Sequence, residues 1–374
     1  MTEVTGANHE AHRGADGARQ ETPGGEVRSA AAARGSLVME AIATGKDFRL
    51  GRGQVLHAVR DVSLNLYRGA VVALVGESGS GKSTVARLLA GQEHLTTGSI
   101  RLDGKPVDVA AGAAFRRYKS HVQLVFQDPF ASLNPVHTVR HHLERPVRLR
   151  QDKKSRHEVE AEINALLEQV RLTPAEQFIG KYPHELSGGQ RQRVSFARAL
   201  AARPSVLLAD EPVSMLDVSI RLEMLNLLDD LRQRLKLAML YITHDIASAR
   251  YFADEVLVMY AGRIVERGPA EEVTQRPAHP YTQLLVASAP DPDNLGGALR
   301  DSGRNGQARA GQAEAVPATG CPFSPRCPLA EDRCRQDTPG LLRVSAERAA
   351  ACWRLDAAAP ELMSAQRGGG DMPG

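Results

Sequence analysis

A glycine-rich segment, GESGSGKST at residues 76–84, combines the residue types that bind phosphate. Its glycines let the backbone curl so that several N–H groups point inward, and a helix starting here would add the positive end of its dipole. Lys82 would place a full charge on the β- and γ-phosphates of a nucleotide, and Ser83 would give a hydroxyl to Mg²⁺. The expected phosphate-binding residues are Gly76, Ser78, Gly79, Ser80, Gly81, Lys82, Ser83 and Thr84.

The alternative is a Gly/Ser turn that happens to carry a lysine. The sequence on either side of the glycine-rich segment argues against that interpretation. The apolar run at 70–75 before it predicts a buried strand, and the stretch TVARLLA after the lysine predicts a helix.

A second group of chemically useful residues ends the apolar run VLLADEP at 206–212. At the end of a buried strand, Asp210 could hold magnesium, while Glu211 points elsewhere and could polarise an attacking water. A solvated acidic turn is the alternative, and the pair is informative only beside the phosphate-binding loop. Together the two segments indicate a P-loop nucleoside triphosphatase.

The segment ELSGGQRQR at 185–193 leads from Ser187, Gly188 and Gly189 into a helix-like run. It could be a second N–H cradle at a helix N-terminus, or only a Ser/Gly helix cap. One chain rarely needs two phosphate cradles unless the second serves another nucleotide.

These segments require a scaffold of buried strands and helices. The hydrophobic pattern predicts strands at 58–67, 70–75, 205–210 and 237–243, a hairpin at 254–268, and a helix at 158–170. Buried strands that alternate with helices predict an α/β fold with a parallel sheet.

LSGGQ between a phosphate-binding loop and a DEP strand resembles the signature of ATP-binding cassette (ABC) transporter ATPases. Gln127 in VFQDP, Asp217 in SMLDVS and His244 in YITHD match the Q-loop, D-loop and switch histidine of that family, and Phe48 matches its adenine-stacking aromatic residue. The resemblance covers roughly residues 37–270. It implies a P-loop NTPase (RecA-like) core with an antiparallel β subdomain, a helical subdomain at about 128–187 and a small Cys-containing C-terminal extension.

The resemblance also implies a mechanism. Two such domains face each other head to tail, and each ATP lies between the P-loop of one and the LSGGQ of the other, here Ser187, Gly188, Gly189 and Gln190. Glu211 is then the catalytic carboxylate, His244 contacts the γ-phosphate, and Asp217 crosses to the partner. Ser83, Gln127 and Asp210 are the implied magnesium residues. Met215 departs from the small residue common before Leu-Asp in the family, which affects D-loop packing rather than chemistry.

Two segments narrow the resemblance to ATPases of dipeptide and oligopeptide permeases: VFQDPFASLNP at 125–135 and HPYTQLLVASAP at 279–290. The implied protein is a peripheral subunit on the cytoplasmic face of the membrane. Its implied partners are a second, identical or paralogous ATPase, two membrane permeases and, indirectly, an external substrate-binding protein. A DNA-repair or chromosome-structure ATPase and an importer for nickel or another non-peptide solute are the alternatives. We expect no nucleic-acid partner, because 47 Lys and Arg nearly balance 44 Asp and Glu.

Four cysteines, Cys321, Cys327, Cys334 and Cys352, have the spacing C-x5-C-x6-C-x17-C. They are confined to the last part of the chain, which excludes a scaffold built on disulfides. Iron–sulfur clusters accept four thiolates at such loose spacing. The pattern resembles the C-terminal extension of peptide-permease ATPases, some of which carry a [4Fe–4S] cluster, so the resemblance implies such a cluster here. Zinc and four reduced thiols without metal are the alternatives.

Composition predicts the remaining organisation. Residues 1–35 and 356–374 read as disordered tails and 291–320 as a linker, around an ATPase domain at 36–270, a permease-type segment at 271–290 and the four-Cys extension at 321–355. No apolar run reaches the roughly 18–20 residues of a membrane-spanning helix, and no secretory pattern opens the chain, so a cytoplasmic location is expected.

Overall fold

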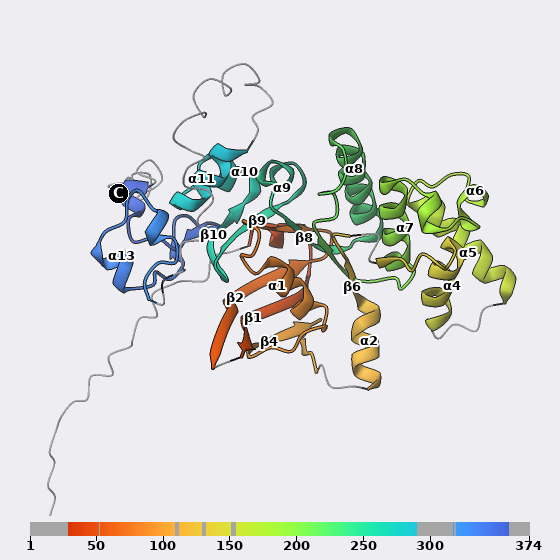
Figure 1. The fold of residues 1–374 in the computed structure, drawn as a ribbon, viewed down its shortest axis with the longest axis horizontal. Coiled ribbons are helices and arrows are strands. Elements are labelled where there is room, and N and C mark those ends of the chain that lie inside the picture. Colours follow the sequence, from red (N-terminus) through yellow and green to blue (C-terminus); the bar gives the residue numbers. More distant parts are fainter. Residues whose placement is uncertain are drawn as a thin grey trace, which may run out of the picture.

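An eight-stranded sheet runs through the middle of the molecule, with helices at one end and the cysteine-bearing extension at the other (Figure 1). The structure is a computed structural model that describes residues 29–51, 53–108, 112–128, 132–150, 155–289, 317 and 319–358. Its mixed α/β architecture confirms the expected fold class.

The order of the large sheet is β11-β12-β10-β9-β3-β8-β7-β6. Its strands are β3 (Val71–Val75), β6 (Val122–Val125), β7 (Val206–Asp210), β8 (Ala238–Thr243), β9 (Glu255–Tyr260), β10 (Arg263–Pro269), β11 (Leu342–Arg343) and β12 (Ala349–Ala350). The five strands from β9 to β6 are parallel, whereas β10, β12 and β11 pair antiparallel. The predicted buried strands and the hairpin at 254–268 are therefore confirmed.

Strand β3 shows why an apolar run without alternation becomes a central strand. All five of its side chains are buried. Val72 and Leu74 belong to a core cluster shared with α1 (Lys82–Leu89) and the smaller sheet. The alternating residues Val71, Ala73 and Val75 belong to a second cluster, shared with α8 (Val218–Leu235) and α9 (Ile246–Phe252). Each fully buried Val or Leu contributes about 1.5–3 kcal/mol. Both faces of the strand are therefore in the core, and its end is held in a fixed position.

The smaller, antiparallel sheet has the order β2-β1-β4-β5. Its strands are β1 (Leu37–Leu50), β2 (Gln54–Tyr67), β4 (Thr97–Leu102) and β5 (Lys105–Pro106). Alternation along β2 buries Val59, Val62, Leu64 and Leu66, the apolar positions that predicted this strand. The exposed end of the β1–β2 ribbon carries Phe48 opposite Leu56.

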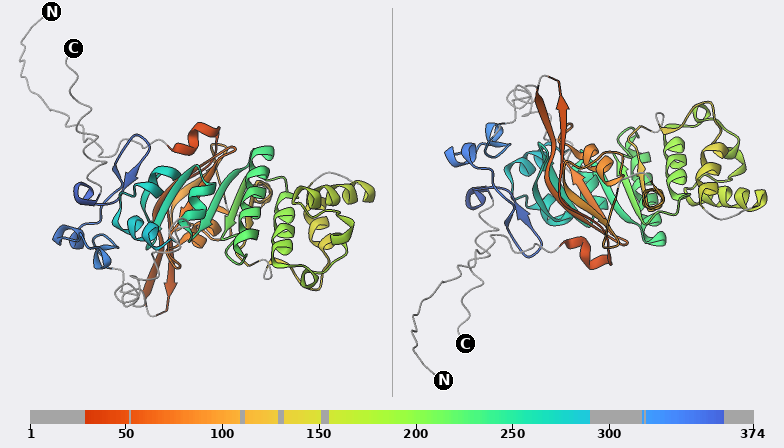
Figure 2. Two further views of the ribbon diagram at one scale, coloured as in Figure 1. Left: turned by 90° about the horizontal axis from the view of Figure 1, so that it is seen from above. Right: turned by 90° about the horizontal axis from the view of Figure 1, so that it is seen from below.

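The helical part lies beyond β6 at one end of the molecule (Figure 1), and Figure 2 shows these yellow and green helices at the end opposite the blue cysteine-bearing extension. It contains α4 (Val139–Leu149), α5 (Arg156–Gln169), α6 (Glu176–Ile179), the short 3-10 helix η2 (Pro183–Glu185) and α7 (Gly188–Leu200). Helix α5 matches the predicted helix at 158–170, and a capping box between Ser155 and Glu158 starts it. Helix α2 (Ala113–His121) precedes β6.

The cysteine-bearing extension is joined to the core sheet. After α10 (Ala270–Gln275) and α11 (Pro280–Ser288), it contains η3 (Ser324–Arg326), α13 (Asp332–Gln336), β11, β12 and α14 (Leu355–Ala358). Strand β12 pairs with β10 at Glu266 and Arg267. Arg348, 1% exposed, donates to the equally buried Glu266 carboxylate at 3.0 Å. Removing one partner of such a buried pair costs about 3–5 kcal/mol, so the extension is fastened to the sheet.

The chain ends differ from the expected boundaries. The expected tail ran to residue 35, but Ala30–Arg34 form the 3-10 helix η1, with Ala31 fully buried and the Ser29 hydroxyl donating to Glu255. Helix η1 contacts β2 and β10, and the small Ala31 side chain is buried there. Helix α14 likewise extends past residue 355. Residues 1–28, 290–316 and 359–374, where the tails and linker were expected, lie outside the described residues. Within the described chain, no helix is both long and apolar enough to span a bilayer.

Candidate active site

The site is built at the carboxyl ends of four neighbouring parallel strands. In the order β3-β8-β7-β6, these strands are followed by the glycine-rich loop, His244, the Asp210–Glu211 pair and Gln127. Ligands of open α/β sheets bind at this edge, because strand ends and helix N-termini meet there. Segments far apart in the sequence therefore come together because the sheet order differs from the chain order.

The loop after β3 depends on glycine at defined places. A Cβ at Gly76 would lie 2.2 Å from the carbonyl oxygen of Met259, and one at Gly81 would lie 2.4 Å from that of Ala58. Gly81 also has φ +106°, a conformation that side chains with a Cβ rarely adopt. The loop thus passes between β2 and β9 with backbone in contact with backbone.

Lys82 lies at the start of α1 and is almost fully buried. Its Nζ donates to the carbonyl oxygens of Gly76 and Glu77 at 2.7 and 2.8 Å, so the ammonium is held inside the curl of the loop. Burial lowers the pKa of Lys82, and nearby Glu211, Asp210 and Glu77 oppose that shift. A cation buried among carboxylates at a helix N-terminus is suited to bind phosphate.

Asp210 supplies the donor atoms that a magnesium ion requires. It is 7% exposed, and its Oδ1 is buried with no hydrogen-bond partner among the described residues. Burial raises the pKa of Asp210, and a hydrogen bond from Ser83 opposes the shift. A carboxylate oxygen without a partner beside a hydroxyl matches the hard oxygen ligands of Mg²⁺. The residues present therefore fit the ion.

Glu211 follows Asp210 but faces a different group of side chains. Its φ of +46° turns the chain at the end of β7. Gln127 Nε2 donates to Glu211 Oε2 at 2.9 Å, and His244 Nδ1 lies 3.1 Å from the same oxygen. Three residues that were expected to act together thus meet at one carboxylate oxygen, which is directed toward the loop.

A cavity of about 840 Å³ joins these groups. It is lined by Phe48, Leu56, His57, Ala58, Arg60, Glu77, Ser78, Gly79, Gly81, Lys82, Ser83, Thr84, Gln127, Glu211, His244, Ala261, Gly262 and Leu285. Phe48 is one of these lining residues, and Lys46 Nζ lies 4.8 Å from its ring centroid. Gly76 and Ser80 belong to the loop but do not line this cavity, and Ser80 is buried with its hydroxyl unpartnered among the described residues.

The LSGGQ residues are not part of this cavity. Ser187 caps α7, accepting from Gln190 N at 3.2 Å while its own N–H donates to Gln190 Oε1 at 3.0 Å. Gly188 and Gly189 pack against Leu216 and Ile220, beside Asp217 at the start of α8. The signature and the D-loop residue therefore form a second group of residues, separate from the phosphate-binding loop of the same chain.

Two residues at the site were not foreseen. Arg326 forms two hydrogen bonds with Glu77, at 2.9 and 3.0 Å, and the Tyr281 hydroxyl accepts from Glu77 N–H at 2.9 Å. Tyr281 lies in the HPYTQLLVASAP segment that indicated the permease group, but no motif marks either residue as part of this site. The one available signal was the carboxylate of Glu77 inside a loop that binds anions, since such a charge calls for a cation elsewhere in the chain.

The four cysteines converge on a separate small cavity of about 10 Å³ in the extension, and all are free thiols. Burial raises the pKa of the thiols of Cys321 and Cys327, and that of Cys352 to about 11. Among the described residues, however, no set of three or more His, Cys, Asp or Glu side chains is arranged to hold a metal ion.

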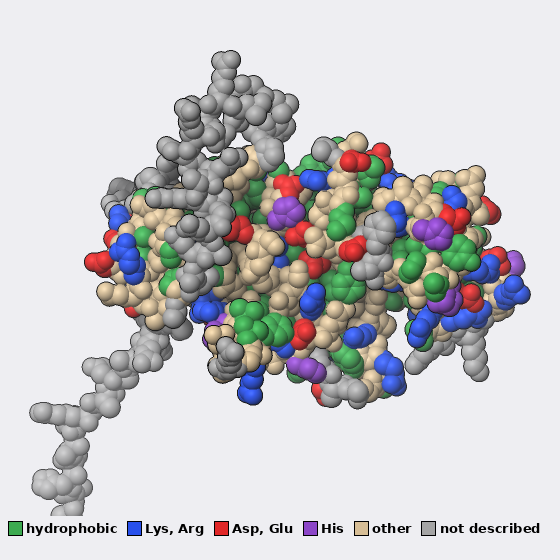
Figure 3. Space-filling view, viewed as in Figure 1, with side chains coloured by type: hydrophobic (Ala, Val, Ile, Leu, Met, Phe, Trp, Pro, Cys, Tyr) green, Lys and Arg blue, Asp and Glu red, His purple; other side chains and the backbone are tan. Residues whose placement is uncertain are grey.

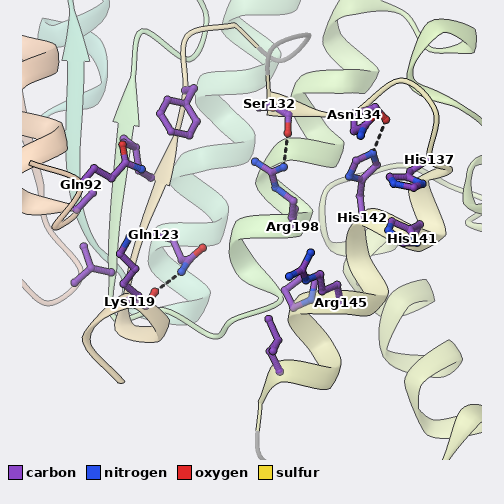
Figure 4. Close-up of a pocket in the computed structure, with 16 residues that line it drawn as sticks. Gln92, Lys119, Gln123, Ser132, Asn134, His137, His141, His142, Arg145 and Arg198 are labelled. Carbon is purple, nitrogen blue, oxygen red and sulfur yellow. Dashed lines mark hydrogen bonds between the residues drawn. The ribbon is translucent and has the colours of Figure 1, made fainter. Parts of the chain in front are cut away.

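A third cavity, of about 560 Å³, separates the core from the helical part (Figure 4). Lys119 and Gln123 lie on its core side, and His137, His141 and His142 lie on the other. The rings of His137 and His141 stack with centroids 3.9 Å apart, and burial lowers the pKa of His142. Arg145 and Arg198 add positive charge, and no carboxylate belongs to the described lining.

Two family profiles match the chain: "ABC transporter" over residues 59–214 and "Oligopeptide/dipeptide transporter, C-terminal region" over residues 265–334. The oligopeptide transport ATP-binding protein OppF of Salmonella typhimurium is 40% identical over 319 residues, covering 84% of this chain and 93% of that protein. The probable peptide ABC transporter ATP-binding protein y4tS of Sinorhizobium fredii is 41% identical over 311 residues, covering 82% and 86%.

The fold has relatives among solved structures. The ATP-binding cassette MJ0796, in a dimeric post-hydrolysis state bound to ADP and Pi, superposes with a TM-score of 0.56 at 27% identity. The match covers 62% of this chain and 98% of that chain.

The buried carboxylate predicts a pH-dependent stability. Because the pKa of Asp210 is raised on folding, its contribution is favourable below the unfolded value and is lost as pH rises through the folded value. In EDTA at pH 7, Asp210→Asn should raise the free energy of unfolding by about 1 kcal/mol, the scale of one unpaired buried acceptor. The gain should shrink as pH falls toward 4, as measured by urea denaturation.

Asp332→Asn, at an exposed position of the extension, serves as the control. It should change the free energy of unfolding neither at pH 7 nor near pH 4. An Asp210→Asn variant that is less stable than the wild type at pH 7 would contradict the assignment of a carboxylate whose charged form is destabilised by burial.

Proposed function

Since this chain belongs to the ABC transporter family of ATPases, we propose that it is the ATP-binding subunit of an importer for peptides of the dipeptide or oligopeptide class. The C-terminal match at residues 265–334 and the peptide-transport names of the relatives support this substrate class. The observation that carries the proposal is the convergence of Gln127, Glu211 and His244 beside the phosphate-binding loop.

Each residue then has a role in hydrolysis. Lys82 and the N–H groups at the start of α1 bind the phosphates, and the Phe48 ring stacks on adenine. Asp210, Ser83 and Gln127 would hold Mg²⁺, which neutralises the phosphate oxygens.

Glu211 orients a water and accepts its proton as the water oxygen bonds to the γ-phosphorus and the bond to the β–γ bridging oxygen breaks. His244 holds Glu211 and contacts the γ-phosphate. The tight cluster around Glu211 Oε2 supports these assignments.

The ATP site is completed by a second ATPase subunit. Ser187, Gly188, Gly189 and Gln190 lie outside the cavity of their own chain, yet they form a helix N-terminus suited to phosphate. In a head-to-tail dimer they would face the partner's γ-phosphate, and Asp217 would cross the interface beside them. The dimeric form of the related cassette bound to ADP and Pi supports this arrangement.

One of the two membrane permeases would dock in the cavity of Figure 4, and the other would dock on the second ATPase subunit. Phe126 lines that cavity, while the next residue, Gln127, lines the nucleotide cavity and bonds Glu211. A change at the γ-phosphate can therefore reach the docking surface through one peptide bond. Lys and Arg side chains also gather on the helical end of the molecule (Figure 3), so the docking segment should carry carboxylates.

This docking fixes the place of the subunit in the transporter. It would lie on the cytoplasmic face of the membrane, and substrate would reach the permeases from an external binding protein. Peptide and ATP would then never meet on this chain.

We also propose that the extension binds a [4Fe–4S] cluster through Cys321, Cys327, Cys334 and Cys352. All four thiols surround one cavity, and four thiolates are the usual ligands of such clusters. Each thiolate of such a cluster would bind a different iron. Binding would open the small cavity and release the thiol protons.

Glu211→Gln tests the catalytic assignment. The amide keeps the shape of the side chain but cannot accept the proton, so ATP hydrolysis should fall by at least about 10²-fold while ATP binding persists. In the assembled transporter reconstituted in vesicles, uptake of a labelled dipeptide should be lost as well. Glu223→Gln, on an exposed surface of α8, is the control. Unchanged hydrolysis by the Glu211 variant would refute its role as base.

Iron and sulfide analysis of anaerobically purified protein tests the cluster. The proposal expects about four irons and four sulfides per chain, and replacing all four cysteines with serine should remove them. Stoichiometric zinc without iron, or protein free of metal, would refute it.

A further inference from the structure

The phosphate-binding loop carries a carboxylate close to the phosphates that it is expected to bind. Glu77 is the second residue of the loop and lines the nucleotide cavity. Together with Asp210 and Glu211 it contributes negative charge around Lys82. ATP itself carries about four negative charges at neutral pH, so an unpaired Glu77 would repel it.

The cysteine-bearing extension supplies the compensating cation. The two terminal nitrogens of Arg326 donate hydrogen bonds to the two carboxylate oxygens of Glu77, at 2.9 and 3.0 Å. The two residues are 249 positions apart in the sequence. The two side chains are 30% and 42% exposed, so water screens the pair only in part. A two-pronged guanidinium contact of this kind fixes both the charge and the orientation of the carboxylate.

Aromatic packing holds Arg326 in place. Its guanidinium carbon lies 5.9 Å from the ring centroid of Tyr260 and 5.6 Å from that of Phe323. Tyr281 packs against both rings, with centroids 4.6 and 5.4 Å away. The same Tyr281 accepts the Glu77 N–H through its hydroxyl. The backbone and the side chain of Glu77 are thus held by residues from beyond position 280.

The extension that holds Arg326 is itself anchored to the core sheet. Strand β12 continues the sheet beside β10, and Ala351 N–H donates to Val265 O at 2.7 Å. The buried pair of Arg348 and Glu266 locks the same contact. Arg326 therefore reaches the loop from a segment that is joined to the sheet containing β9 and β3.

We propose that Arg326 is a positioning residue of the ATP site, which neutralises Glu77 and so sets the affinity of the loop for anionic nucleotides. The proposal rests on the proposed binding of ATP to this loop. It makes the extension a part of the nucleotide site of its own chain. The loop then depends on the extension for its charge balance.

A charge-based role has a signature that a purely structural role lacks. Arg326→Ala should raise the Kd of ATP on the order of tenfold, the effect of one uncompensated charge near the phosphates. The effect should be smaller for ADP, absent for adenosine, and reduced in high salt. Adding Glu77→Gln to Arg326→Ala should restore most of the affinity, since it removes the carboxylate that Arg326 neutralises. Arg326→Lys should keep part of the affinity.

Nucleotide binding is measured by calorimetry on the full chain. Arg354→Ala is the matched control, because Arg354 forms a similar ion pair with Glu331 in the extension, at 2.8 Å and 35% exposure, away from the loop. The sole tryptophan, Trp353, also lies in the extension, so its fluorescence reports whether each variant keeps that part folded.

Equal losses for ATP and adenosine, or no rescue by Glu77→Gln in a variant with native Trp353 fluorescence, would overturn the inference. So would wild-type affinity in Arg326→Ala. If the wild-type chain itself binds no ATP, the proposed function fails instead, which separates the two ideas.

Discussion

The parallel pairing of β3, β8, β7 and β6 is the constraint on which the site depends. Each strand delivers one chemical component at its carboxyl end: the phosphate-binding loop, His244, the Asp210–Glu211 pair and Gln127. The side chains within β3, β7 and β8 are all buried, so the strand ends cannot shift without opening the core. The favourable packing within the sheet thereby offsets the unfavourable crowding of charged residues at its edge.

At that edge, adjacent residues perform different tasks because the backbone turns between them. The left-handed conformation of Glu211 separates its carboxylate from that of Asp210. One acid pairs with Ser83, and the other with Gln127 and His244. The same division occurs at Phe126 and Gln127, which line different cavities. Short turns at strand ends thus connect the nucleotide cavity to the cavity of Figure 4, which lies beside the helical part.

The central strands and the loop could be predicted from the sequence, because both depend on local pattern. Continuous apolar runs such as residues 70–75 marked buried strands, and the glycines and lysine of residues 76–84 marked the loop. The joining of the extension to the sheet could not be predicted, since β12 has only two residues. The ion pairs Arg348–Glu266 and Arg326–Glu77 could not be predicted either. Their members are 82 and 249 positions apart, respectively, and no rule of sequence spacing predicts such contacts.

The central claim is that the LSGGQ segment of this chain completes the ATP site of another subunit. Orthovanadate trapped with ADP in place of the γ-phosphate cleaves nearby backbone under ultraviolet light, so cleavage maps what surrounds that position. In the transporter assembled with its partner ATPase, the account predicts cuts in this chain at residues 76–84 and also at residues 187–190. The chain as a monomer should be cut only in the first segment. Cuts confined to residues 76–84 in the assembled transporter would contradict the account.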